Sequence, residues 1–125
     1  MAKKTTLTYE QKISNAIYSL PNPIEDKRHT LLIYFIDNRA RSNETRFAHI
    51  AQKRHKLNVS DILRIPKRIN TSIFKKDKER KETFNLYIKR NGYSDNQYIK
   101  LSLAIEDKNP RRAVVKTIFI TERIK

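Results

Sequence analysis

Residues 97–106 read QYIKLSLAIE, and this stretch decides the fold. Every second side chain is aliphatic and most of those between are polar, so that Ile99, Leu101, Leu103 and Ile105 alternate with Tyr98, Lys100, Ser102 and Ala104. A period of two is typical of a β-strand that turns one face toward a hydrophobic core and the other away from it. The sequence therefore predicts a half-buried strand here.

Two neighbouring stretches predict partners for this strand. Residues 83–90 and residues 112–121 are rich in β-branched and aromatic side chains, which favour strands. Asn91-Gly92 is a strong signal for a tight turn, and residues 107–110 end in a proline and predict a second turn. The C-terminal half of the chain is thus expected to form an antiparallel meander.

The beginning of the chain shows the period of a helix instead. Thr8 and Gln11 have the spacing of a capping box. Apolar residues then follow at i, i+3, i+4 and i+7: Ile13, Ala16, Ile17 and Leu20. A helix is therefore predicted from Thr8 to the prolines at 21 and 23.

Further elements are expected between this helix and the meander. Residues 31–36 (LLIYFI) predict a short buried strand. A second helix is predicted from Ser42 or Asn43 to about residue 55, with its apolar stripe at residues 47, 50 and 51. A shorter helix is predicted from Ser60, and Pro66 would interrupt or kink it.

These elements predict an α+β protein, with two or three N-terminal helices packed on an antiparallel sheet of three to five strands. The 125 residues are enough for one hydrophobic core. We expect a basic tail and the first helix in residues 1–28, and the α+β domain in residues 29–125.

The chain is strongly basic. Lys and Arg number 28 against 13 Asp and Glu, which gives a formal charge of +15, and residues 39–80 carry +9 of it. Such a charge favours a polyanionic partner, of which RNA is the leading candidate and DNA, an anionic membrane or an acidic protein are alternatives. There is no cysteine for a disulfide or a thiolate metal site, and no bound metal or cofactor is expected. The longest apolar run is six residues, so we expect no membrane span and a cytoplasmic location.

The predicted helix over residues 42–55 carries the candidate chemistry. At 100° per residue, Arg46, His49 and Lys53 lie on one flank, and His55 lies at the helix end, where the dipole would favour its protonated form. Lys56 follows directly. Cleavage of RNA without a metal needs a base, an acid and cations around the phosphate, which histidine, arginine and lysine supply. A solvated helix face, with His55 only ending the helix, is the alternative interpretation.

The polar face of the predicted sheet is the second candidate. It would present aromatic, basic and hydroxyl side chains that could stack a base and contact a phosphate: Tyr87, Lys89, Tyr98, Lys100, Ser102, Thr117 and Phe119. It could equally be the solvent side of a sheet that is buried on one face.

Three stretches, in this order, resemble a known family. They are FAHIAQKRH at 47–55, Asp61-Ile62 at the start of the next helix, and VVKTIF at 114–119. The pattern is similar to that of the phage- and mobile-element-associated nucleases of the barnase–EndoU–colicin–RelE superfamily. The resemblance covers about residues 29–125 and implies helices followed by an antiparallel sheet. Residues 69–72 (INTS) lack the proline usual in the loop before the sheet, which leaves a non-catalytic, RNA-binding relative as an alternative.

The resemblance implies a metal-independent endoribonuclease, toxin- or effector-like, that cleaves by attack of the ribose 2′-OH. His49 and His55 would share the acid and base roles, with Arg54 and Lys89 or Lys100 stabilising the phosphorane and Thr117 bonding a phosphate oxygen. The expected RNA-binding residues are Arg46, Lys53, Lys56, Lys67, Arg68 and Lys100. A cognate antitoxin or protein target would be the protein partner. The rival hypotheses are a non-catalytic nucleic-acid-binding regulator of a mobile element, and a protein inhibitor of a nucleic-acid enzyme.

Overall fold

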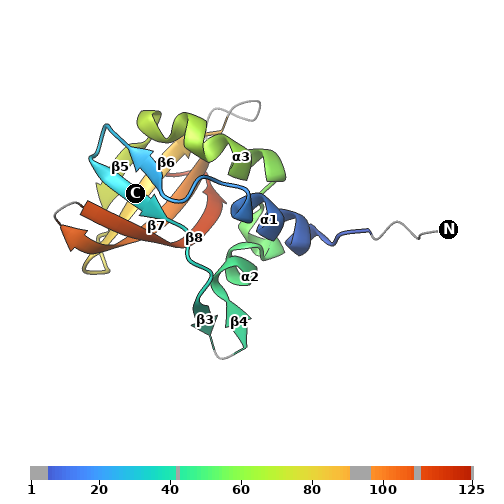
Figure 1. Ribbon diagram of the computed structural model, residues 1–125. Coiled ribbons are helices and arrows are strands. Elements are labelled where there is room, and N and C mark those ends of the chain that lie inside the picture. The colour runs from blue at the N-terminus through green and yellow to red at the C-terminus, as the bar shows by residue number, and fades with distance from the viewer. Residues whose placement is uncertain (1–5, 42, 91–96, 109–110, 125) are drawn as a thin grey trace.

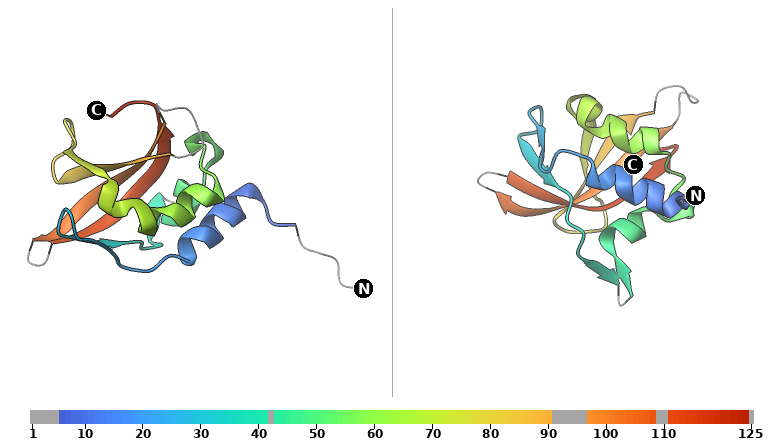
Figure 2. Two further views of the ribbon diagram at one scale, coloured as in Figure 1. Left: turned by 90° about the horizontal axis from the view of Figure 1, so that it is seen from above. Right: turned by 45° about the vertical axis from the view of Figure 1, so that its right-hand side comes forward.

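The computed structural model describes residues 6–41, 43–90, 97–108 and 111–124. Three helices pack on one face of a curled sheet, and a small two-stranded hairpin projects from the body below α2 (Figure 1). The turned views show α1 and α3 side by side over the same face (Figure 2). The α+β class is therefore confirmed.

The helices and strands alternate along the chain more than the sequence predicted. The helical elements are α1 (Tyr9–Tyr18), α2 (Arg46–Ile50), α3 (Val59–Arg68) and two single 3₁₀ turns, η1 (Lys53–His55) and η2 (Ile69–Thr71). The strands are β1 (Ile24–Asp26), β2 (Leu31–Tyr34), β3 (Arg39–Arg41), β4 (Glu44–Thr45), β5 (Ile73–Lys76), β6 (Thr83–Lys89), β7 (Tyr98–Lys108) and β8 (Arg111–Thr121).

The main sheet has six strands in the order β1-β2-β8-β7-β6-β5, and β2 runs parallel to β8. The prediction of a purely antiparallel sheet of three to five strands is wrong on both points. The missed strands β1 and β5 have only three and four residues, too few for a clear period. The sheet curls enough for its edges to approach, since Phe74 of β5 stacks at 5.2 Å on His29 of the β1–β2 turn.

The predicted meander is present as β6, β7 and β8, and its alternation is confirmed. Ile99, Leu101 and Leu103 are buried in the core that the helices cover, and Lys100 lies on the opposite, outer face. The turn predicted at Asn91-Gly92 lies outside the described residues. The turn predicted at residues 107–110 is wrong in its first half, because Asp107 and Lys108 continue β7 and pair with Arg112 and Arg111; Asn109 and Pro110 lie outside the described residues. Where Ser102 pairs with Thr117 and Leu103 pairs with Val115, β8 carries one extra residue, Lys116.

The first helix is confirmed together with its cap. The hydroxyl oxygen of Thr8 accepts the Gln11 backbone N–H at 3.1 Å, and the Gln11 side chain accepts the Thr8 N–H at 2.9 Å. Ile13, Ala16 and Ile17 are buried on the predicted face. The hydroxyl of Tyr9 donates to the carbonyl of Leu57, which fastens this helix to the segment before α3.

The single helix predicted over residues 42–55 is wrong. Thr45 starts a helix of only five residues by accepting the Ala48 N–H, and Gln52 then takes an extended backbone before η1. The residues before Thr45 form the β3–β4 hairpin, although Ser42 itself lies outside the described residues. Lys56 ends η1 at φ 61°, in the left-handed region that glycine or asparagine usually takes. This broken path separates His55 from the helix of His49.

The last helix begins at Val59 rather than at Ser60, and Pro66 does not end it. The carboxylate of Asp61 accepts the backbone N–H of Asn58 at 2.8 Å at the start of the helix. The same carboxylate receives two hydrogen bonds, both 2.9 Å, from Arg90 after β6, and both side chains are buried. This ion pair joins α3 to the sheet.

Candidate acid–base site

The broken path between α2 and η1 brings two histidine rings into contact. The ring centres of His49 and His55 lie 5.4 Å apart, with an angle of 77° between the planes. His49 is partly exposed, whereas His55 is 7% exposed. Two imidazoles at this separation can act on a single phosphate group.

The hydrogen bond of His55 determines which of its nitrogens can act as a base. Nδ1 lies 2.8 Å from the carbonyl oxygen of Ile50. Because a carbonyl oxygen only accepts, Nδ1 carries the proton and Nε2 keeps a lone pair. Burial lowers the pKa of His55, the charge of Arg54 lowers it further, and the bond to Ile50 only partly offsets this. The expectation that a helix dipole favours the protonated form is therefore wrong, since His55 sits in a separate, buried turn.

A carboxylate from the projecting hairpin orients the other histidine. Oε1 of Glu44 lies 3.0 Å from Nδ1 of His49, and Oε2 accepts the amide of Gln52 at 2.7 Å. The side-chain carbonyl oxygen of Gln52 in turn accepts a hydrogen bond from Nε of Arg54. Glu44 thereby fixes the His49 ring with Nδ1 toward the carboxylate, which leaves Nε2 for a substrate.

The outer face of the sheet supplies a cation next to this pair. The Phe119 ring centre lies 6.2 Å from that of His55, and Nζ of Lys100 lies 5.1 Å from the same Phe119 ring. Lys100 also lies 5.6 Å from the ring centre of Tyr87, as a cation between two aromatic faces. The ammonium and the His55 imidazole thus flank one aromatic ring.

A hydroxyl without a partner lies on the same face. Thr117 is two residues before Phe119 in β8, opposite Ser102, and its Oγ1 is buried with no hydrogen-bond partner among the described residues. A buried hydroxyl left unpaired costs about 1–3 kcal/mol.

The other predicted site residues are placed differently. Lys53, Arg54 and Lys56 are exposed around η1, beside the histidine pair. Lys89 is also exposed and pairs with Tyr98, one row along the outer face from Lys100. Of these cations, Arg54 joins the site through its hydrogen bond to Gln52, and the others are exposed around it.

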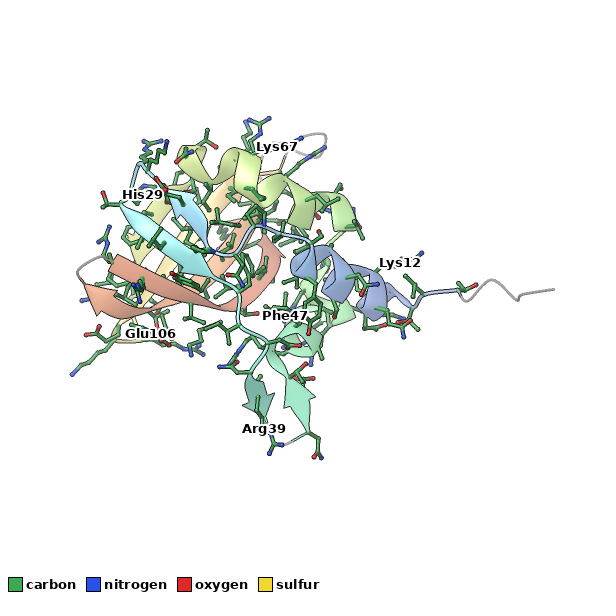
Figure 3. All side chains as sticks on the ribbon, viewed as in Figure 1. Lys12, His29, Arg39, Phe47, Lys67 and Glu106 are labelled. Atoms are coloured by element: carbon green, nitrogen blue, oxygen red, sulfur yellow. The ribbon has the colours of Figure 1, made fainter. Side chains whose placement is uncertain are left out.

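Three further predicted residues do not join the histidines. Arg46 is already engaged, since it donates to the carbonyl of Lys116 at 3.1 Å and to the side chain of Asn38 at 3.3 Å. Lys67 and Arg68 lie about 12 Å along α3 from its start. Figure 3 shows Lys67 at the opposite end of the molecule from Arg39 of the projecting hairpin.

The sequence did not indicate two side chains of the site, Glu44 and Gln52. Glu44 contacts His49, and Gln52 contacts Glu44, only because the helix is short and a hairpin precedes it. Phe119 was expected on the outer face, but its contact with His55 depends on the packing of η1 against β8. The Glu-x₄-His spacing could have suggested the contact between Glu44 and His49.

Comparisons of the chain with protein-family models, curated proteins and solved structures find no match. No cluster of three or more metal-ligating side chains occurs within the part of the chain that the structure describes. None of the described helices is long and apolar enough to cross a membrane.

Proposed function

We propose that the protein is a metal-independent endoribonuclease whose active site lies between the histidine pair and Lys100. The observation that carries the proposal is that His55 and Lys100 flank the Phe119 ring, with His49 in contact with His55. A phosphate over Phe119 would then have a base, an acid and a cation around it. The charge of +15 and the resemblance of residues 47–55 and 114–119 to the barnase–EndoU–colicin–RelE nucleases also support it.

The two histidines have different roles in the proposed reaction. His55, neutral with a free Nε2, removes the proton of the ribose 2′-OH, and O2′ attacks the adjacent phosphorus. The bond from phosphorus to O5′ breaks, and protonated His49 donates a proton from Nε2 to that oxygen. The products are a 2′,3′-cyclic phosphate and a 5′-OH, and proton exchange with water restores both histidines.

Lys100 and Thr117 stabilise the charge that develops on the phosphorane. Lys100 lies close enough to the Phe119 ring to contact a nonbridging oxygen above it. The Thr117 hydroxyl, otherwise unpaired, would donate a second hydrogen bond. Donors already in place for the transition state lower the barrier because they need no reorganisation.

Cleavage of labelled RNA in EDTA tests the proposal. The wild type should release fragments ending in a cyclic phosphate, identified by mass spectrometry. His55→Gln and His49→Ala should each lose about 10²–10⁴-fold in rate, the usual contribution of an acid or a base. His29→Asn is the matched control, because His29 pairs with Asp26 in the β1–β2 turn and Asn keeps a donor for that carboxylate. Thermal unfolding of each variant checks that it is folded.

A non-catalytic RNA-binding protein is the second candidate function. The observation that favours it is the burial of His55 and its bond to the Ile50 carbonyl, which a purely structural histidine would also show. Binding of RNA without cleavage by the wild type would establish this alternative. Equal cleavage by wild type and His55→Gln would overturn the assignment of His55 as a catalytic residue.

A further inference from the structure

A cavity of about 460 Å³ opens at the root of the β3–β4 hairpin. All of its lining side chains can form hydrogen bonds: Asp37, Asn38, Arg39, Asn43, Glu44 and Thr45. Its volume is within the range of about 300–1,000 Å³ that is usual for small-ligand sites. The hairpin that carries Arg39 stands away from the body, so the cavity is open to large ligands (Figure 3).

The cavity offers hydrogen-bond donors. Asn38 uses its side-chain oxygen on Arg46, which leaves its amide N–H groups for a ligand. The side chains of Arg39 and Asn43 are exposed and form no hydrogen bond with any other described residue. A guanidinium and two amides therefore face the cavity, and a ligand can bind them without replacing existing hydrogen bonds.

The cavity also offers ionised acceptors. Burial would raise the pKa of Asp37, but hydrogen bonds from Tyr18, Phe47 and Thr45 together hold it below its ordinary value. Glu44, the second carboxylate, already faces His49. Two carboxylates would repel a phosphate, and Arg39 would repel a metal ion, so the ligand should be neutral with both donors and acceptors.

We infer that this cavity binds a nucleobase of a single-stranded RNA next to the scissile phosphate. The edge of a base alternates donors and acceptors, which matches a wall of amides, guanidinium and carboxylates. In a duplex those edges are paired and inaccessible, so only an unpaired base can enter. Glu44 belongs both to the cavity wall and to the His49 contact, so the bound base and the cleaved phosphate would be neighbours along the strand. The inference rests on the proposed nuclease function and adds base selectivity to it.

Cleavage of short single-stranded oligoribonucleotides that differ in one base tests the inference. The wild type should prefer one base at one position beside the cut. Arg39→Ala and Asn43→Ala should each reduce that preference, measured as the ratio of kcat/KM values for the best and the worst base, by about fivefold or more. Arg112→Ala removes an exposed arginine from the distant end of β8, where it pairs with Leu32, and should keep the full preference.

Two results would overturn the inference: equal cleavage of all bases by the wild type, or an unchanged preference in both cavity variants. If the wild type does not cleave at all, the proposed function fails. The cavity is then tested by fluorescence anisotropy with the same oligonucleotides. A base-dependent Kd that Arg39→Ala abolishes supports the cavity, and a Kd independent of the base sinks it.

Discussion

Two features of its surroundings determine the protonation of His55. Its Nδ1–H is held by the Ile50 carbonyl, and its burial together with the charge of Arg54 disfavours protonation of Nε2. A base that stays neutral in mildly acidic solution can accept a proton there, whereas an ordinary imidazole would already be charged. The residue is therefore suited to the base role more than to the acid role.

This difference predicts the pH dependence of cleavage. The acid limb of kcat/KM should have its midpoint below pH 6.5, because the pKa of His55 is lowered and its neutral form is the active one. Arg54→Gln removes a charge that lowers this pKa, so the midpoint should move up toward 6.5. Lys12→Gln is the control. The Lys12 side chain is exposed on α1, and its replacement should leave the midpoint unchanged. An acid limb above pH 6.5 in the wild type would contradict the assignment of His55 as base.

The same group predicts a pH dependence of stability that needs no catalysis. The unfolded chain protonates His55 near pH 6.5, whereas the folded protein resists protonation until a lower pH. The free energy of unfolding should therefore fall as the pH is lowered from 6.5 through the folded pKa. Denaturant titrations at several pH values measure it, and His55→Gln should flatten the slope in that interval.

At the scale of single residues, the sequence suggested side chains but not their geometry. His49, His55 and Lys100 were expected at a site because their side chains suit phosphate chemistry. The two imidazoles are in contact, and Lys100 lies over the Phe119 ring, which is also near His55. The charge state of His55 could not be predicted, because burial arises only when η1 packs against β8. Glu44 was missed because its contact with His49 depends on a turn that helical periodicity does not reveal.

At the scale of elements, periodicity and capping residues predicted what was long or well marked. The first helix and β6, β7 and β8 lie where their patterns place them. The segment over residues 42–55 has the apolar spacing of a helix, but Thr45 caps a later start and the extended backbone of Gln52 breaks it. The parallel pairing of β2 with β8 joins residues about 80 apart, which no local pattern encodes.

The ion pair between Asp61 and Arg90 makes a prediction about the link between α3 and the sheet. Both side chains are buried and share two hydrogen bonds, so Asp61→Ala removes the carboxylate that pairs with the buried charge of Arg90 and should cost about 3–5 kcal/mol of unfolding free energy. Adding Arg90→Met removes that charge, so the double variant should be more stable than Asp61→Ala alone. Urea unfolding of the wild type, Asp61→Ala and the double variant gives the comparison. A double variant no more stable than Asp61→Ala would show that the charge itself is not the cost.

At the scale of the whole molecule, α1 and α3 lie on the side of the sheet opposite to the strand residues of the candidate site. α1 and α3 cover one face (Figures 1 and 2). Lys100, Thr117 and Phe119 lie on the other, and His55 of η1 approaches Phe119 of β8. The charge of +15 attracts RNA to any surface at long range. Only side chains that touch phosphates release counterions when RNA binds, so salt dependence separates attraction from contact.

Binding of single-stranded RNA to His55→Gln tests this distinction. The variant is used so that cleavage does not interfere with the measurement. The logarithm of the binding constant should fall linearly with the logarithm of salt concentration, with a slope of about −0.7 per phosphate contacted. Lys100→Gln and Lys53→Gln should each reduce the steepness by about 0.7, because both cations lie at the site. Lys12→Gln removes the same charge from the helical side, where Figure 3 shows its side chain, and should leave the slope unchanged. If all three variants changed the slope equally, net charge rather than the outer face would account for binding, and the RNA would have no defined place on the molecule.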